Sequence, residues 1–220
     1  VHVAFCRSPY AHAKIVSINT DQAAPTPGVL GIITGAELLD YCSPWTGVLT
    51  HRQGLKSAPQ YAIAIDRACW QGEAVCAVLA ETRAQAEDAV ALIDIEYEEL
   101  PVVVDMETAL DEHTPLIHPE LGDNLCFQRE VDFGEVDKAF ADAHAVVEET
   151  FHFGRHTGVC LETRGIVADY NPATSHLTVY LSAQAPHMMK NLYAKHFGIS
   201  EDNVRVICKD VGGSFGIKVH

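Results

Sequence analysis

The residues best suited to chemistry lie near the end of the chain, in the glycine-rich stretch Val211–Lys218, which reads VGGSFGIK. Glycine accepts positive φ, so several backbone N–H groups can gather around one point and hold a ligand. The spacing does not fit a Walker A phosphate loop, because Ile217 separates Gly216 from Lys218 and Val219 follows. It does not fit a dinucleotide fingerprint either. On composition alone, a ligand-holding loop and a plain turn stay equally open.

The cysteines and histidines are scattered along the chain. The seven cysteines include no C-x-x-C pair, so their spacing favours no zinc site, iron–sulfur cluster or disulfide framework. A reducing compartment, the cytoplasm, is therefore expected, although an export signal ahead of Val1 would allow the periplasm. His152 and His156 are four residues apart, but Gly154 lies between them in an alternating segment, and no histidine metal site is predicted.

The charge balance excludes one class of partner. The chain has 15 Lys and Arg against 30 Asp and Glu, a formal net charge of −15. Binding to a phosphate backbone needs clustered basic residues, so no nucleic-acid partner is predicted. Hydrophobic residues make up 48% of the chain, but no apolar run reaches membrane length. The composition indicates a folded protein in solution that has no membrane partner.

The elements that must position the loop follow from hydrophobic periodicity. In the first half, the apolar run 74–80 predicts a strand, and Thr82 with Gln85 predicts a capping box that opens a helix. An alternating strand over 93–97 follows, with its acidic residues in solvent. We also expect strands over 3–6, 13–18 and 29–33, a capping box at Thr34 and Glu37, and an irregular loop over 40–67.

The second half follows a segment from Asp111 to Gly134 in which turn formers and charges replace the apolar rhythm. Beyond it the pattern predicts a short helix near Val136–Ala143 and a strand over 146–153, then a β-hairpin of strands 166–170 and 177–181. A helix from Pro186 to Phe197, stopped by Gly198, and a strand over 204–208 then lead to the glycine loop.

Five segments together carry a resemblance to one family: FCRSPYAHA (5–13), GEAV (72–75), AETRAQAEDA (80–89), YEELP (97–101) and GGSFG (212–216). They resemble the molybdenum-binding large subunit of the xanthine dehydrogenase and aldehyde oxidase family, which includes aerobic carbon monoxide dehydrogenase. The resemblance implies an α/β (α+β) fold. An α/β hammerhead domain would occupy 1–111, a linker 112–134, and the incomplete N-terminal part of a molybdopterin-binding domain, with mixed sheet and helices, 135–220.

The resemblance also implies an activity. Such a molybdopterin-dependent oxidoreductase would oxidise an aldehyde, a heteroaromatic or a similar small substrate at an electron-poor carbon, using a water-derived oxygen. It implies a molybdopterin-type molybdenum cofactor, for which the cytosine dinucleotide form is one option. Electrons would pass to 2Fe–2S and FAD centres in partner subunits or domains of an oligomeric complex.

The same resemblance implies that the subunit continues beyond His220 and that its catalytic carboxylate base lies in that remaining C-terminal part. We therefore expect this chain alone to be inactive. Glu162, in Leu161-Glu162-Thr163, matches a Leu-Glu element of the family that we interpret as structural.

The family's cofactor contacts carry over at matching positions. Gln184, in Ser182-Ala183-Gln184, would bring its side-chain amide to an oxygen ligand of the molybdenum, and no residue of this chain would ligate the metal directly. The loop residues implied to lie against the cofactor are Gly212, Gly213, Ser214, Phe215 and Gly216.

Phe215 and Val219 would line the substrate pocket. Purine-oxidising members carry a glutamate where Val219 stands, so a bound purine would lose a charged acceptor at a cost of about 1–3 kcal/mol. Aldehydes, other heteroaromatics or carbon monoxide are therefore favoured as substrates. Ser214 and Ile217 replace glycines that are usual in the family, which makes the loop stiffer.

A second hypothesis treats the chain as a non-catalytic split subunit, or as a module that docks a redox partner. It is favoured by the missing catalytic base, and the reading frame after His220 would distinguish it from a longer enzyme. A third, an unrelated phosphate-binding module, is disfavoured because the Gly-Lys-Ser/Thr sequence is absent.

Overall fold

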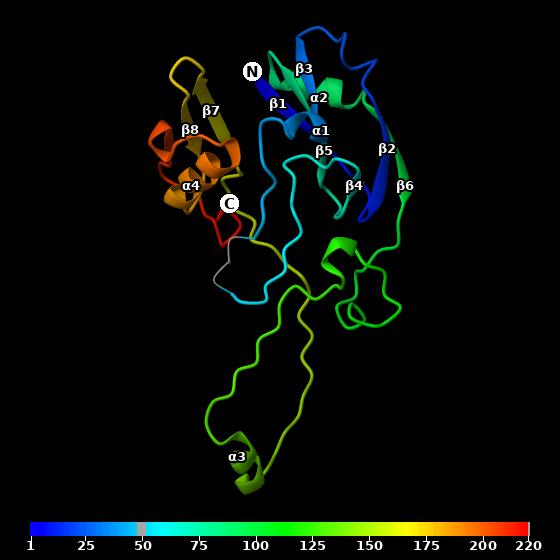
Figure 1. The fold of residues 1–220 in the computed structure, drawn as a ribbon, viewed down its shortest axis with the longest axis vertical. Coiled ribbons are helices and arrows are strands. Elements are labelled where there is room, and N and C mark those ends of the chain that lie inside the picture. Colours follow the sequence, from blue (N-terminus) through cyan, green and yellow to red (C-terminus); the bar gives the residue numbers. More distant parts are fainter. Residues whose placement is uncertain (48–51, 220) are drawn as a thin grey trace. The chain divides into compact units, whose positions relative to one another are not determined.

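The computed structural model describes residues 1–47 and 52–219. It divides into two compact units, Val1–Phe127 and Gln128–His220 (Figure 1). Short helices accompany antiparallel and mixed sheets, which confirms the predicted α/β class. The predicted loop over 40–67 includes residues 48–51, which, like His220, lie outside the described residues.

The first unit contains a three-stranded antiparallel sheet in the order β1-β5-β3. Its strands are β1 (His2–Arg7), β3 (Val29–Thr34) and β5 (Ala74–Ala80), and α2 (Arg83–Val90) packs against β1 and β5 (Figure 1). One cluster of its core unites Ala23, Val78 and Ala89. The strands predicted over 3–6, 29–33 and 74–80 are confirmed.

A second sheet of the same unit has the order β4-β2-β6, with antiparallel pairing throughout. It consists of β2 (Ala13–Asn19), β4 (Arg67–Ala68) and β6 (Asp94–Glu99). Its core cluster contains Ile15, Ala64 and Val75. Val75 and Val78, both on β5, enter different clusters, so β5 is buried on both faces. This explains why its sequence is almost continuously apolar.

Two caps and two short helices complete this unit. The backbone N–H of Thr34 donates to Glu37 Oε2 over 2.7 Å at the start of α1 (Gly35–Leu38), as predicted. At α2 the Thr82 hydroxyl accepts from the Gln85 N–H over 3.3 Å. The Gln85 carboxamide contacts the Thr82 hydroxyl rather than its backbone, so this cap is only half of a capping box. A 3-10 turn, η1 (Pro119–Leu121), follows later.

The second unit places a β-hairpin beside a helix. β7 (Ile166–Asn171) pairs antiparallel with β8 (His176–Leu181), and β9 (Val204–Ile207) joins β8 in parallel. α4 (Pro186–Phe197), with η2 (Glu201–Asn203), connects β8 to β9 and packs on β9. The predicted hairpin, helix and final strand are confirmed. In the described parts of the chain, no helix is long and apolar enough to cross a membrane.

One predicted strand is wrong. Residues 146–153 have no regular secondary structure, although the nearby α3 (Val136–Asp142) forms as expected. Val147 is 88% exposed and Phe153 is 83% exposed. Apolar alternation identifies the face that a strand would bury, but a strand also needs a neighbouring backbone. No described strand pairs with this segment.

Candidate functional site

The glycine loop leaves β9 and turns through a sequence of unusual backbone conformations. Gly213, Phe215 and Gly216 have φ of +94°, +45° and +87°. Positive φ is unfavourable for a phenylalanine, by about 1–3 kcal/mol, so the surrounding structure must hold it. The Phe215 ring is nevertheless 76% exposed. The loop therefore presents an aromatic ring outward on a constrained backbone.

Two glycines lie close to Phe215. A Cβ added to Gly158 would lie 2.7 Å from Phe215 Cβ, and one added to Gly213 would lie 3.2 Å from Phe215 Cε2. Two backbone hydrogen bonds of 2.9 Å, from Gly213 N–H to the Val211 carbonyl and from Ile217 N–H to the Ser214 carbonyl, close the loop on itself. The position of the ring thus depends on glycine both inside the loop and in the segment before β7.

A single carboxylate oxygen joins three segments beneath this loop. Glu162 Oε2 accepts from the Ser182 hydroxyl over 2.7 Å, from the Gly212 N–H over 2.7 Å and from Lys218 Nζ over 2.9 Å. The Lys218 ammonium, followed by the Ser182 hydroxyl and the Gly212 amide, lowers the pKa of Glu162 to about 2. The carboxylate therefore stays ionised at neutral pH. We call Glu162, Ser182, Gly212 and Lys218 the anchor network.

Lys218 is the buried member of this network. Its side chain is 1% exposed, whereas that of Glu162 is 39% exposed. Lys218 Nζ also donates to the Ser182 hydroxyl over 2.9 Å. An ammonium removed from water needs such partners, because an unpaired buried charge is costly.

Gln184 lies beside the loop because of a backbone contact. Its N–H donates to the Lys218 carbonyl over 2.9 Å. The residue follows the end of β8 and precedes Pro186, which opens α4 and stops the strand from continuing. Gln184 is exposed, and its side-chain amide makes no hydrogen bond to any described residue. It thus offers a free donor and acceptor next to the glycine loop.

The sequence-predicted site residues fall into one region of the second unit. Gln184 and the loop lie together, and Val219 is half-buried directly after Lys218. Gly212 lies against Glu162, since an added Cβ would stand 2.5 Å from Glu162 Cβ. The contributions of Ser182 and Lys218 were missed. No local sequence pattern predicts a contact between Glu162 and a lysine 56 residues away.

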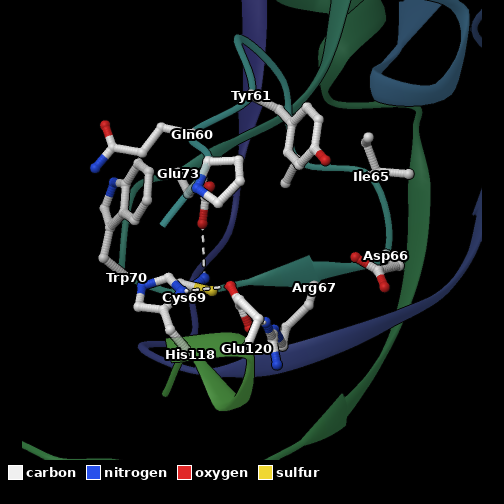
Figure 2. A pocket seen from close by; sticks show the side chains of 12 residues that line it. Gln60, Tyr61, Ile65, Asp66, Arg67, Cys69, Trp70, Glu73, His118 and Glu120 are labelled. Carbon is white, nitrogen blue, oxygen red and sulfur yellow. Dashed lines mark hydrogen bonds and ion pairs between the residues drawn. The ribbon is translucent and has the colours of Figure 1, made fainter. Parts of the chain in front are cut away.

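The first unit holds a cavity of about 260 Å³ that is lined by both apolar and polar side chains. Figure 2 shows Cys69, Glu73, Arg67, His118 and Glu120 converging on it. These side chains come from β4, from the turn before β5, and from the segment around η1. The Arg67 guanidinium lies 3.6 Å from Glu120 Oε2, and His118 Nδ1 lies 3.4 Å from Glu120 Oε1.

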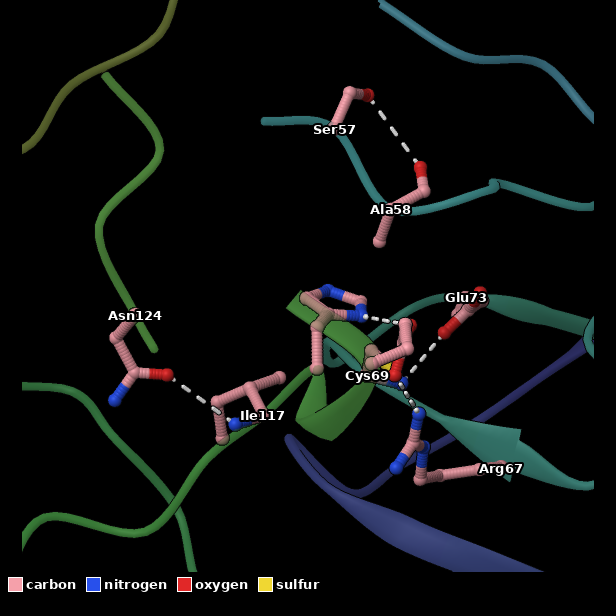
Figure 3. Close-up of polar contacts among 9 residues, drawn as sticks. Ser57, Ala58, Arg67, Cys69, Glu73, Ile117 and Asn124 are labelled. Carbon is pink, nitrogen blue, oxygen red and sulfur yellow. Dashed lines mark hydrogen bonds and ion pairs between the residues drawn. The ribbon is translucent and has the colours of Figure 1, made fainter. Parts of the chain in front are cut away.

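Glu73 and Cys69 form the inner part of this cavity. The Cys69 N–H donates to Glu73 Oε2 over 2.6 Å, a contact drawn in Figure 3. Glu73 is 7% exposed, and burial raises the pKa of its carboxyl above its usual value. Burial also raises the pKa of the Cys69 thiol. A thiol that stays protonated is a poor nucleophile, so the geometry indicates a structural polar cluster.

The structure describes the side chains of residues 1–47 and 52–219, which bear on metal ligation. Within these ranges, no group of three or more His, Cys, Asp and Glu residues is placed to hold a metal ion.

Two family models match the chain. The model of the aldehyde oxidase and xanthine dehydrogenase a/b hammerhead domain matches residues 1–101, and that of the molybdopterin cofactor-binding domain matches residues 117–220.

Individual proteins agree with these matches. The large subunit of nicotine 6-hydroxylase from Paenarthrobacter nicotinovorans is 37% identical over 220 residues, covering 100% of this chain and 27% of the relative. The large chain of carbon monoxide dehydrogenase from Hydrogenophaga pseudoflava is 33% identical over 232 residues, covering 100% and 28%. The chain thus spans about a quarter of the length of these relatives.

The fold is shared as well. The crystal structure of quinoline 2-oxidoreductase from Pseudomonas putida 86 matches with a TM-score of 0.91 and 36% identity, covering 99% of this chain and 27% of that one. The resemblance inferred from the five sequence segments is confirmed. The chain belongs to the xanthine dehydrogenase and aldehyde oxidase family of molybdopterin-dependent oxidoreductases, in which it corresponds to part of the large subunit.

Proposed function

We propose that this chain forms part of the cofactor pocket of a molybdenum hydroxylase that oxidises a nitrogen heteroaromatic compound or an aldehyde at an electron-poor carbon. In this proposal residues 1–111 are the hammerhead domain, 112–134 a linker and 135–220 the first part of the cofactor-binding domain. The observation that carries the proposal is the 2.9 Å hydrogen bond from the Gln184 N–H to the Lys218 carbonyl. It sets two segments with family cofactor motifs side by side.

The described residues fit a molybdenum cofactor with oxygen ligands. The exposed Gln184 amide has no partner among them and can donate a hydrogen bond. Gly216 is exposed with φ +87°, and a Cβ added there would meet no atom within 4 Å. Such open space next to a backbone N–H lets a ligand approach closely. Neutral donors also suit a site whose metal is already ligated by its own cofactor.

The residues of this chain would have distinct tasks. When bound, the cofactor supplies the two-electron redox centre and a water-derived oxygen. Gln184 would donate from its side-chain amide to a cofactor oxygen, and the backbone of Gly212, Gly213, Ser214, Phe215 and Gly216 would line the cofactor. The exposed Phe215 ring would form a flat apolar wall for the substrate and exclude water from it. The proton-transfer base would come from another part of the protein.

The substrate proposal combines two indications. Val219 offers a purine no charged acceptor, which disfavours xanthine. Nicotine and quinoline, named in two of the relatives, are nitrogen heteroaromatics, and a flat ring suits stacking on Phe215. We therefore rank nitrogen heteroaromatics first, aldehydes second and carbon monoxide third.

We further propose a cytoplasmic complex in which electrons leave through 2Fe–2S and FAD partner subunits, and a cytosine dinucleotide form of the cofactor. Two of the relatives are named as a large subunit and a large chain, which supports a multi-subunit assembly.

The test uses the natively purified full-length protein with its partners. Molybdenum content and pterin fluorescence are measured first. Oxidation of quinoline, nicotine, an aromatic aldehyde, carbon monoxide and xanthine is then assayed in H₂¹⁸O. We expect about one molybdenum per subunit and ¹⁸O in the hydroxylated heteroaromatic product, with xanthine slowest. A fully active complex that lacks both molybdenum and pterin would refute the proposal.

A further inference from the structure

The side chain of Lys218 is buried, although it belongs to the same short loop as the exposed Phe215. Its side chain is 1% exposed, while Phe215, three residues earlier, is 76% exposed. A buried ammonium contributes little net stability, because its desolvation offsets most of the attraction to its partner. A turn that only had to reverse the chain would not need such a cation. The burial of Lys218 indicates that the loop has to be held in one position.

The contacts of Glu162 show which parts are positioned. Its Oε2 accepts from Gly212 at the beginning of the loop and from Lys218 at its end, over 2.7 and 2.9 Å. Its backbone N–H also donates to the Gly212 carbonyl over 3.4 Å. One carboxylate therefore spans both ends of the loop.

The third contact reaches the segment that carries Gln184. The Ser182 hydroxyl donates to Glu162 Oε2 over 2.7 Å and accepts from Lys218 Nζ over 2.9 Å. Two residues later, the Gln184 N–H donates to the Lys218 carbonyl over 2.9 Å. Lys218 is thus bonded through its side chain to the end of β8 and through its backbone to Gln184 itself.

We propose that Glu162 and Lys218 are positioning residues, which set the separation between the Gln184 amide and the backbone of the glycine loop. This inference rests on the proposed function, in which both of those elements contact the cofactor. Neither Glu162 nor Lys218 touches a reacting atom. With two glycines and a phenylalanine at positive φ, the free loop has many accessible conformations, and the anchor network selects one.

The two charged members of the anchor network differ in burial, so replacing one should have a different effect from replacing the other. Replacing Lys218 by methionine leaves a Glu162 side chain that is 39% exposed and can be hydrated. Replacing Glu162 by glutamine leaves the buried ammonium without its counter-charge. Glu162→Gln should therefore be the more damaging single change, and adding Lys218→Met to it should restore part of the loss.

The experiment compares Lys218→Met, Glu162→Gln and the double variant in the full-length protein, with the exposed Lys209→Met as the matched control. Hydrogen exchange is measured on cofactor-free protein. We expect the Gly212 and Gln184 amides to exchange at least ~10-fold faster in the single variants and unchanged in the control. Unchanged exchange at both amides would overturn the proposal. This arm does not depend on cofactor binding, so it separates failure of the inference from failure of the proposed function.

The second arm measures turnover per bound molybdenum in the loaded enzyme. Misplacement of Gln184 and the loop should lower kcat per molybdenum by about 10- to 100-fold with a smaller change in KM. Faster exchange with unchanged kcat per molybdenum would also overturn the positioning role. If Glu162→Gln does not fold, Ser182→Ala replaces it, because it removes the two hydrogen bonds of the Ser182 hydroxyl and keeps the ion pair between Glu162 and Lys218. Ser182→Ala should show the same changes at smaller amplitude. Wild-type exchange rates and wild-type kcat per molybdenum in both single variants, Ser182→Ala and Lys218→Met, would overturn the proposal.

Discussion

Glu162 Cβ occupies the space that a side chain at position 212 would need, since a Cβ added to Gly212 would stand 2.5 Å from it. The two residues are also joined by the 2.7 Å hydrogen bond from the Gly212 N–H to Glu162 Oε2. This contact gives the first glycine of the loop a role inside the protein, in addition to any role towards a ligand.

We expect Gly212→Ala to push Glu162 away and to loosen the loop. Molybdenum content per subunit should fall at least ~5-fold, while the melting temperature of the full-length protein changes by less than about 3 °C. The control is Gly165→Ala, since a Cβ at Gly165 would meet no atom within 4 Å. Equal molybdenum content in both variants would contradict the prediction.

Gln184→Ala should slow turnover without unfolding the protein. The side chain is exposed and makes no hydrogen bond within the described residues, so its removal leaves no buried group unsatisfied. Loss of one donor to a developing charge typically costs about 100-fold in kcat. The measurement is kcat per bound molybdenum, with the exposed Gln128→Ala as control. Parallel losses of molybdenum and melting temperature at unchanged turnover per metal would argue against the assigned role.

The anchor network should fail only in strong acid. Because the folded-state pKa of Glu162 is lowered to about 2 from an ordinary 4.5, its contribution is fully present above pH 4.5 and is lost as the pH falls towards 2. Hydrogen exchange at the Gly212 amide, corrected for intrinsic rates, should show constant protection from pH 7 to about 4.5 and a decline below that. In Lys218→Met, where the pKa of Glu162 is less lowered, the decline should be smaller and should be complete at a higher pH. A decline centred near pH 6 in the wild type would be inconsistent with this assignment.

Gly35 should tolerate no side chain. A Cβ there would stand 2.4 Å from the Ala64 carbonyl oxygen and 2.5 Å from that of Ile63. We expect Gly35→Ala to lower the free energy of unfolding by about 1–3 kcal/mol, as overpacking typically does. Gly31→Ala, on the adjoining β3, meets no atom within 4 Å and should be close to neutral. Denaturant titration gives the free energy of unfolding of both variants. Equal destabilisation would show that the close approach of position 35 to the Ile63 and Ala64 carbonyl oxygens does not matter.

Cys6 should react with alkylating reagents at neutral pH. It faces Cys76 across the β1–β5 pair, and a hydrogen bond from the Cys76 thiol lowers the pKa of Cys6 to about 7. Labelling of Cys6 by iodoacetamide, followed by peptide mass spectrometry, should rise through pH 7. In Cys76→Ala the midpoint should move upward. An unchanged midpoint would mean that Cys76 does not stabilise the thiolate.

Local signals predicted much of the second unit. The turn cluster after Tyr170 and the alternation on both sides of it correctly indicated the β7–β8 hairpin, because adjacent strands need only short-range pairing. Pro186 and Gly198 correctly bounded α4, since each acts on its own backbone.

Contacts between distant segments could not be predicted in the same way. The alternation in 146–153 resembles that of β8, yet only β8 has neighbouring strands. Likewise, periodicity predicted strands over 74–80 and 93–97, but it could not assign β5 and β6 to different sheets. The family motifs proposed Gln184 and the loop as cofactor contacts, whereas the ion pair between Glu162 and Lys218 depends on folding across 56 residues.

In the proposed function, the inward orientation of Lys218 would separate the residues that fasten the loop from those that contact the substrate. Its immediate neighbours Ile217 and Val219 are only partly buried, and Phe215 is largely exposed. In directed evolution, a library that randomises Phe215 and Val219 while keeping Glu162, Gly212 and Lys218 could therefore explore new substrates without discarding the loop's attachment. The same arrangement would let natural relatives diverge in what they oxidise while retaining one way of fastening the loop.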